Sequence, residues 1–186
     1  MTTAQPLPRG EIIQQMDGTY ELFPIPTDQD TLYGILNDCL AEWENVRIGM
    51  LIPGAVWEIK PPRQPRIGFL DGYFTVDFQE WHLHICIGEH KSAPPEVARL
   101  RRTARAELYR RLNPDHQPTS WGLRLFNGGD QQQITVLLPN PHLDEHQNYE
   151  QQPQWQRLYL WDRLRQKYLS TNEDPTDRSA PGFYHG

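Results

Sequence analysis

The sequence predicts an α+β fold, and three observations support this prediction. Apolar residues recur at helical spacing in some segments and alternate with polar residues in others, and the two kinds of segment do not alternate regularly. The chain has 186 residues, enough to bury one core without disulfide bonds. We expect a single α+β domain at residues 27–169, preceded by an irregular arm at residues 1–26 and followed by a flexible tail at residues 170–186.

The arm is predicted to be irregular because it contains four prolines. A helix is expected directly after it, since Thr27 can cap the helix and acidic residues occupy the first turn. The apolar stripe of this helix consists of Leu32, Ile35, Leu36, Cys39, Leu40 and Trp43. We expect Cys39 to be a small buried side chain in that stripe.

Alternating segments predict several strands between residues 47 and 87. The predicted strands are Ile48–Ile52, Ala55–Lys60, Arg66–Leu70, Tyr73–Phe78 and His82–Ile87. Asp71-Gly72 indicates a two-residue hairpin turn. If residues 79 and 80 form the next turn, Val76 lies opposite Leu83, and the large apolar side chains share one face. The other face then carries Asp77 opposite His82.

Residues 81–169 are predicted to form the second half of the domain, with residues 27–80 as the first half. We expect a helix at Pro94–Leu112 that presents six arginines, a hairpin of Trp121–Phe126 with Gln133–Leu138, and a last helix at Gln154–Leu169. The resulting β-α-β-β-α order is that of a thioredoxin-like module. In this interpretation the first half is an extension made of a helix and antiparallel strands.

Composition excludes several classes of protein. The net charge of −6 and pI of about 5.6 argue against a nucleic-acid-binding protein. Two cysteines cannot form an iron–sulfur cluster or a four-cysteine zinc site. Apolar runs fall short of the roughly 18 residues of a membrane span, and the N-terminus lacks a secretory pattern. We therefore expect a soluble, cytoplasmic protein.

The segment Trp81–His90 holds the best candidates for a metal site. His82, His84 and Cys86 have the same strand parity and project from one face. Two histidines at this spacing can share a divalent metal, or bind haem iron, and the candidate metal ligands are His82, His84, Glu89 and His90. Asp77 could orient His82 through its second ring nitrogen. A solvated sheet face is the plainer explanation of the same pattern.

The arginine-rich segment favours an anionic ligand, because guanidinium groups suit oxyanions. The candidate ligand-binding residues are Tyr73, Asp77, His82, His84, Cys86, Arg102 and Arg105. Our first hypothesis is a non-catalytic protein that binds a small anion or another protein. The alternative is a metal-dependent enzyme or a protein that handles haem or metal through His82 and His84. A scaffold protein that uses its proline-rich ends is a third possibility.

Five sequence blocks carry a resemblance to known proteins. They are His-Leu-His-Ile-Cys-Ile-Gly-Glu-His at 82–90, Arg-Arg-Thr-Ala-Arg-Ala-Glu-Leu-Tyr-Arg-Arg at 101–111, Ser-Trp-Gly-Leu-Arg-Leu-Phe-Asn-Gly at 120–128, Thr-Val-Leu-Leu-Pro-Asn-Pro at 135–141 and Leu-Trp-Asp-Arg-Leu-Arg at 160–165. This half of the chain resembles a family of small bacterial proteins of unknown function. It is also faintly similar to thioredoxin-like [2Fe–2S] ferredoxin domains, but only Cys86 of the four cluster cysteines is in place.

Overall fold

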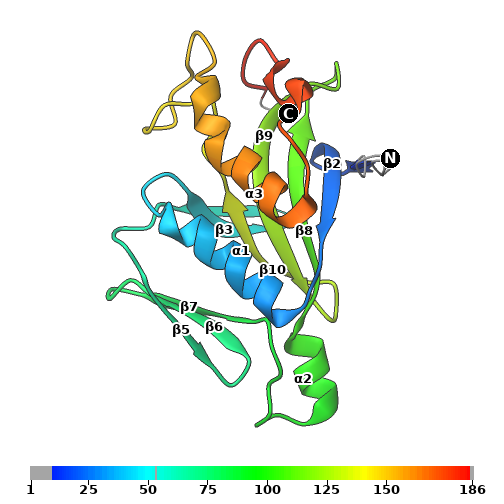
Figure 1. The fold of residues 1–186 in the computed structure, drawn as a ribbon, viewed down its shortest axis with the longest axis vertical. Helices are drawn as coiled ribbons and strands as arrows, with labels where there is room; N and C mark the ends of the chain where they lie inside the picture. The colour runs from blue at the N-terminus through cyan, green and yellow to red at the C-terminus, as the bar shows by residue number, and fades with distance from the viewer. Residues whose placement is uncertain (1–9, 53, 185–186) are drawn as a thin grey trace, which may run out of the picture.

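The computed structural model describes residues 10–52 and 54–184 (Figure 1). The strands are β1 (Glu11–Gln15), β2 (Gly18–Ile25), β3 (Arg47–Ile52), β4 (Ala55–Ile59), β5 (Arg66–Leu70), β6 (Tyr73–Asp77), β7 (His82–Cys86), β8 (Thr103–Leu112), β9 (Pro118–Asn127) and β10 (Gln132–Leu137). The helices are α1 (Gln29–Ala41), α2 (Pro95–Arg101) and α3 (Tyr159–Leu169), with 3-10 turns η1 (Trp155–Leu158) and η2 (Pro175–Arg178). The described strands form a seven-stranded sheet, β1-β2-β8-β9-β10-β3-β4, and a three-stranded sheet, β5-β6-β7, which confirms the α+β class.

Helix α1 lies between the two sheets and joins them into one core (Figure 1). Its Tyr33 packs edge-on against Phe74 of the smaller sheet, with ring centroids 5.2 Å apart. Helix α3 covers the same face of the larger sheet, where Trp161 meets Phe23 edge-on at 5.8 Å. Both helices therefore cover one face of the seven-stranded sheet, and neither covers its other face.

The N-cap of the first helix lies one residue later than expected. Asp28 is the N-cap, and its carboxylate accepts a hydrogen bond from the backbone N–H of Thr31 at 2.9 Å; Thr27 was expected in this role. The predicted apolar stripe is buried from Leu32 to Leu40. None of the helices in the described ranges is long and apolar enough to cross a membrane.

The predicted pairing of β6 with β7 is confirmed. Val76 lies opposite Leu83, and Asp77 lies opposite His82. The preceding turn has positive φ at both Asp71 (46°) and Gly72 (85°), as expected for an Asp-Gly hairpin.

Residues 94–112 do not form the single arginine-rich helix that we predicted. Helix α2 ends at Arg101, Arg102 has extended backbone angles, and β8 follows. Arg110 hides the strand pattern, because it lies on the core-facing side among carboxylates and is only 4% exposed. From β7 onward the chain therefore forms β7, α2, β8, β9, β10 and α3, which is a β-α-β-β-β-α order. The predicted β-α-β-β-α order is wrong, and a thioredoxin-like module is not confirmed.

The arm predicted to be irregular contains strands β1 and β2. Residues 1–9 lie outside the described part of the chain. Pro24 is tolerated in β2 because it lies beyond Leu22, the last β2 residue paired with β1, and so occupies an edge of the sheet. The remaining pairing, with β8, continues to Ile25.

The segment after residue 170, which we expected to be flexible, packs against the core through Asp177 in η2. This side chain is fully buried. Its carboxylate accepts hydrogen bonds from Arg110 Nη1 (2.8 Å), Trp121 Nε1 (2.9 Å), Trp161 Nε1 (2.8 Å) and Arg165 Nη1 (3.1 Å). One acidic residue thus fastens the segment to β8, β9 and α3, which polar composition alone could not indicate.

Candidate functional site

A hollow lies on the face of the seven-stranded sheet that points away from α1 and α3. We call it the sheet cavity; its volume is about 310 Å³. Tyr20 of β2 and Glu58 of β4 both line it, although four strands separate β2 from β4 in the sheet. The sheet is therefore curved, and its two sides approach each other over this face.

Two buried tyrosines form part of the cavity wall. Tyr20 and Tyr109 meet edge-on with ring centroids 5.7 Å apart, and each is 3% exposed. Gly122 of β9 makes room for Tyr109, since a Cβ at this glycine would lie 2.6 Å from the Tyr109 hydroxyl. Burial and a hydrogen bond to Asp17 raise the pKa of Tyr20 to about 12, and burial raises the pKa of Tyr109. Both phenols are thus neutral near pH 7.

Positive charge dominates the cavity. Arg47, Arg111 and Arg157 line it, against the single carboxylate of Glu58. The Nε atoms of Arg111 and Arg157 are buried and have no hydrogen-bond partner among the described residues. Arg111 donates through Nη2 to the backbone carbonyl of Asp17, which orients its guanidinium. A buried donor without a partner is costly, so a ligand oxygen that reached either atom would be favourable, one on each side of the cavity.

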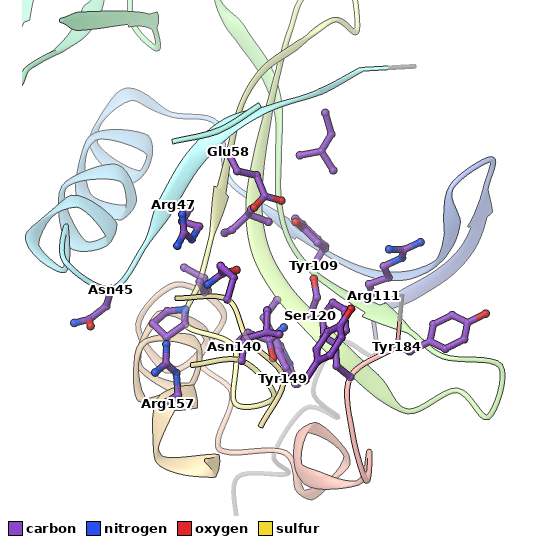
Figure 2. A pocket seen from close by; sticks show the side chains of 18 of the residues that line it. Asn45, Arg47, Glu58, Tyr109, Arg111, Ser120, Asn140, Tyr149, Arg157 and Tyr184 are labelled. Atoms are coloured by element: carbon purple, nitrogen blue, oxygen red, sulfur yellow. The ribbon is translucent and has the colours of Figure 1, made fainter. Parts of the chain in front are cut away.

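Aromatic side chains from the last part of the chain close one side of the cavity. Phe183 and Tyr184 line it, and Phe183 stacks on Tyr149 with centroids 5.3 Å apart. Figure 2 shows Arg111 and Tyr184 on one side of the hollow and Arg157 on the other. The cavity therefore combines cationic groups with flat apolar surfaces.

A second hollow, of about 700 Å³, continues along the same face between the β1–β2 and β3–β4 hairpins. Arg124 lies on its floor, 4.9 Å from the Tyr20 ring and 4.6 Å from the Tyr109 ring. Glu107 accepts two hydrogen bonds from Arg124, at 2.7 and 3.1 Å. Because Arg124 is already paired, this second hollow offers less unpaired charge than the sheet cavity.

The predicted histidine pair lies elsewhere, on the outer face of the small sheet. His82 and His84 are both exposed, and their ring centroids are 5.0 Å apart. Asp77 pairs with His82 across the strands but makes no hydrogen bond to it in the described structure. No group of three or more His, Cys, Asp or Glu side chains that could hold a metal ion occurs in residues 10–52 and 54–184.

The remaining predicted residues separate into two groups. Tyr73, Cys86, Glu89, His90 and Arg102 lie near the end of β7 and helix α2, and three of them (Glu89, His90 and Arg102) line a common hollow. Cys86 is buried, and burial raises the pKa of its thiol, so it is not an activated nucleophile.

Arg105 lies apart from these residues and is the second group by itself. It lies on the cavity-facing side of β8, where it pairs with Glu107 at 2.7 Å and with Asp130 at 2.6 Å. Its expected position on a helix beside the histidines was wrong, because that segment is a strand of the other sheet.

Sequence reasoning missed the residues of the sheet cavity, of which Tyr109 and Arg111 lie on β8. Arg105, Glu107, Tyr109 and Arg111 occupy alternate positions of β8, and this period of two was available in the sequence. The helical spacing of Leu100, Ala104 and Leu108 competes with that pattern over the same residues, which is why the strand was not recognised.

The comparisons with known proteins give a family and no activity. No curated protein matches the chain. Two structures of the haem-binding protein ChuX align with TM-scores of 0.48, at 15% and 14% identity, over 77% and 78% of this chain and 74% of each ChuX chain. A protein from Erwinia carotovora aligns with a TM-score of 0.44 and 15% identity, over 69% of this chain and 67% of that one. Residues 11–170 match a family of unknown function, DUF7676, which confirms the resemblance to an uncharacterised family; the chain belongs to this family.

Proposed function

We propose that the protein binds a small, flat organic anion in the sheet cavity and acts as a non-catalytic binding protein. The observation that carries this proposal is the pair of buried, unpartnered Nε atoms on Arg111 and Arg157. A carboxylate oxygen that reached either atom would satisfy a donor that otherwise remains without a hydrogen bond. The volume of about 310 Å³ is at the lower end of the range for small-molecule sites.

The rest of the cavity supports an aromatic body for this ligand. Tyr20, Tyr109 and Tyr149 line the cavity; Tyr149 is 66% exposed and offers a ring face, whereas Tyr20 and Tyr109 are 3% exposed and offer only ring edges. Rings of this kind stack on flat ligands, while the guanidinium groups bind the acidic end. The chain as a whole carries a net charge of −6, whereas the cavity is locally cationic. The cavity would therefore be the place that selects anions over cations.

A titration with two matched probes tests the proposal. We expect 2-naphthoate to bind the full chain about tenfold more tightly than its neutral amide, 2-naphthamide, because only the acid pairs with the guanidiniums. Trp121 lines the cavity, so quenching of tryptophan fluorescence can report binding, and calorimetry can confirm it. Equal affinity for acid and amide would contradict an anion site.

Two arginine variants locate the binding. Arg111→Ala is expected to weaken 2-naphthoate about tenfold or more, whereas Arg63→Ala, which removes the same charge from the exposed Arg63–Glu80 pair, is expected to change it less than about twofold. An equal loss in both variants would mean that overall charge, and not the cavity, holds the ligand.

The alternative function, handling of metal or haem through His82 and His84, has one observation in its favour. The two rings lie 5.0 Å apart between centroids and are exposed, so they can approach one ion. Water or a partner would have to complete the coordination shell. Zinc and haem titrations of the protein purified without a histidine tag test this alternative. Binding that survives the double replacement of His82 and His84 by alanine would contradict it.

A further inference from the structure

A hollow of about 460 Å³ lies between the loop that follows β7 and helix α2, on a different part of the molecule from the sheet cavity. Lys91, Arg99 and Arg102 line it, and none of the three makes an ion pair with a described residue. Glu89 is the single acidic residue of the lining. Three cations against one carboxylate leave a net positive hollow in an acidic protein.

His90 also lines this hollow, and one of its ring nitrogens has no hydrogen-bond partner in the described structure. Its side chain is 11% exposed, and Nδ1 is buried without a hydrogen-bond partner in the described structure. The other ring nitrogen, Nε2, lies 3.5 Å from Asp71 Oδ2, and the ring meets Tyr73 edge-on at 5.1 Å. Because the Asp71 carboxylate favours a proton on Nε2, Nδ1 is left to interact with whatever occupies the hollow.

The loop that carries His90 is fastened to the β5–β6 turn. The carbonyl of Gly72 accepts hydrogen bonds from Ile87 N at 2.9 Å and from Gly88 N at 2.8 Å. Asp71 accepts a hydrogen bond from Lys91 N at 2.9 Å and another from the Ser92 hydroxyl. These contacts hold His90 and Lys91 in place before any ligand arrives, which lowers the entropic cost of binding.

We propose that this hollow binds a small oxyanion of the phosphate class, with Lys91, Arg99 and Arg102 supplying charge and His90 Nδ1 a hydrogen bond. Phosphate suits an imidazole in either protonation state, because it carries both acceptor oxygens and, near neutral pH, a hydroxyl that can donate. A fully ionised anion such as sulfate lacks that donor and would bind a neutral His90 less well. With a neutral His90, the site would therefore prefer phosphate to sulfate.

Calorimetry of the full chain with inorganic phosphate, at constant ionic strength, tests the proposal. We expect Arg102→Ala to weaken phosphate binding about tenfold, whereas Arg101→Ala changes it less than about twofold. Arg101 is the matched control, because it is the neighbouring exposed arginine and does not line the hollow. Equal losses in the two variants, or no measurable phosphate binding by the unaltered protein, would overturn the proposal.

Two further arms separate the source of the anion and the two sites. Phenyl phosphate that binds at least as tightly as inorganic phosphate would indicate a phosphate monoester as the ligand, and much weaker binding would indicate free phosphate. His90→Asn is expected to remove the preference for phosphate over sulfate, and a retained preference would count against the role of Nδ1. Arg111→Ala in the sheet cavity should leave phosphate affinity unchanged; a loss there would mean that the anion binds in the sheet cavity instead.

Discussion

Trp161 donates a hydrogen bond from its indole Nε1 to Asp177 Oδ2 at 2.8 Å, in the interior of the protein. Asp177 also accepts from Trp121, so one carboxylate satisfies two buried indoles. Arg110 and Arg165 balance its charge. Removing one partner from such a cluster leaves charges buried and unpaired, which is why the cluster yields a clear stability prediction.

Asp177→Asn is expected to lower the free energy of unfolding by about 3–5 kcal/mol, because it leaves two buried guanidiniums short of their counter-charge. Urea unfolding followed by tryptophan fluorescence measures the change. The control is Glu173→Gln, on an exposed side chain of the same segment, with an expected change below about 0.5 kcal/mol. Similar small effects for both variants would show that the buried cluster does not stabilise the fold.

Gly122→Ala is expected to displace the Tyr109 ring into the sheet cavity, because the new Cβ would lie 2.6 Å from its hydroxyl. We expect a loss of about 1–3 kcal/mol in unfolding free energy, as for other overpacked sites, together with weaker 2-naphthoate binding. The double variant Gly122→Ala with Tyr109→Ala tests the cause. The cost of the glycine change should largely disappear in the absence of the ring, and full additivity would exclude the proposed clash.

His142 is expected to make stability depend on pH. The ring is 1% exposed and lies against Trp121 and Trp155, and burial lowers the pKa of His142 below its ordinary value of 6.5. Below pH 6.5 the unfolded chain therefore binds a proton that the native protein resists. The contribution of the neutral His142 ring to the free energy of unfolding is fully present above pH 6.5. It is lost as the pH falls from 6.5 toward the lowered pKa. Denaturant unfolding between pH 7.5 and 5 measures it.

The variant His142→Phe supplies the control for this pH dependence. It keeps a ring between the two tryptophans and removes the titrating group. As the pH falls, the unaltered protein should lose unfolding free energy that the variant keeps, so its stability relative to the variant should decrease. Parallel curves over the whole range would show that His142 does not contribute.

Replacing His82 and His84 together by alanine is expected to change unfolding free energy by less than about 0.5 kcal/mol, because both side chains are exposed. The affinity for 2-naphthoate should also stay the same, since neither residue lines the sheet cavity. Unfolding and binding titrations measure both quantities. A loss of several kcal/mol would mean that the histidine pair has a structural role on the small sheet.

The parts of the fold with local signals could be predicted from sequence. The stripe of α1 and the Asp71-Gly72 turn determine where the elements begin, and the alternation in β6 and β7 determines which residues share a face. Strand β8 also alternates, but a helical spacing competes over the same residues, and Arg110 occupies a core-facing position that alternation assigns to an apolar residue. Its burial depends on Asp177, which is 67 residues away in sequence.

The candidate site was predictable only in its chemistry. The excess of arginine pointed to an anion. The cavity, however, combines Arg47, Arg111 and Arg157 from three distant segments, and no single segment predicts the curvature of the sheet that brings them together. The histidines were conspicuous in the sequence because of their spacing, although the structure leaves them on an open surface. Cytoplasmic location and the absence of nucleic-acid binding stay predictions.

The position of Asp177 also affects how the protein should be prepared. The family match ends at residue 170, and a chain trimmed to that boundary would lack both the Asp177 anchor and the aromatic wall at Phe183 and Tyr184. Arg110 and Arg165 would then remain in the interior without their shared counter-charge. We expect such a trimmed protein to express poorly or aggregate. Boundaries for expression should therefore follow the buried charge network, not the extent of family similarity.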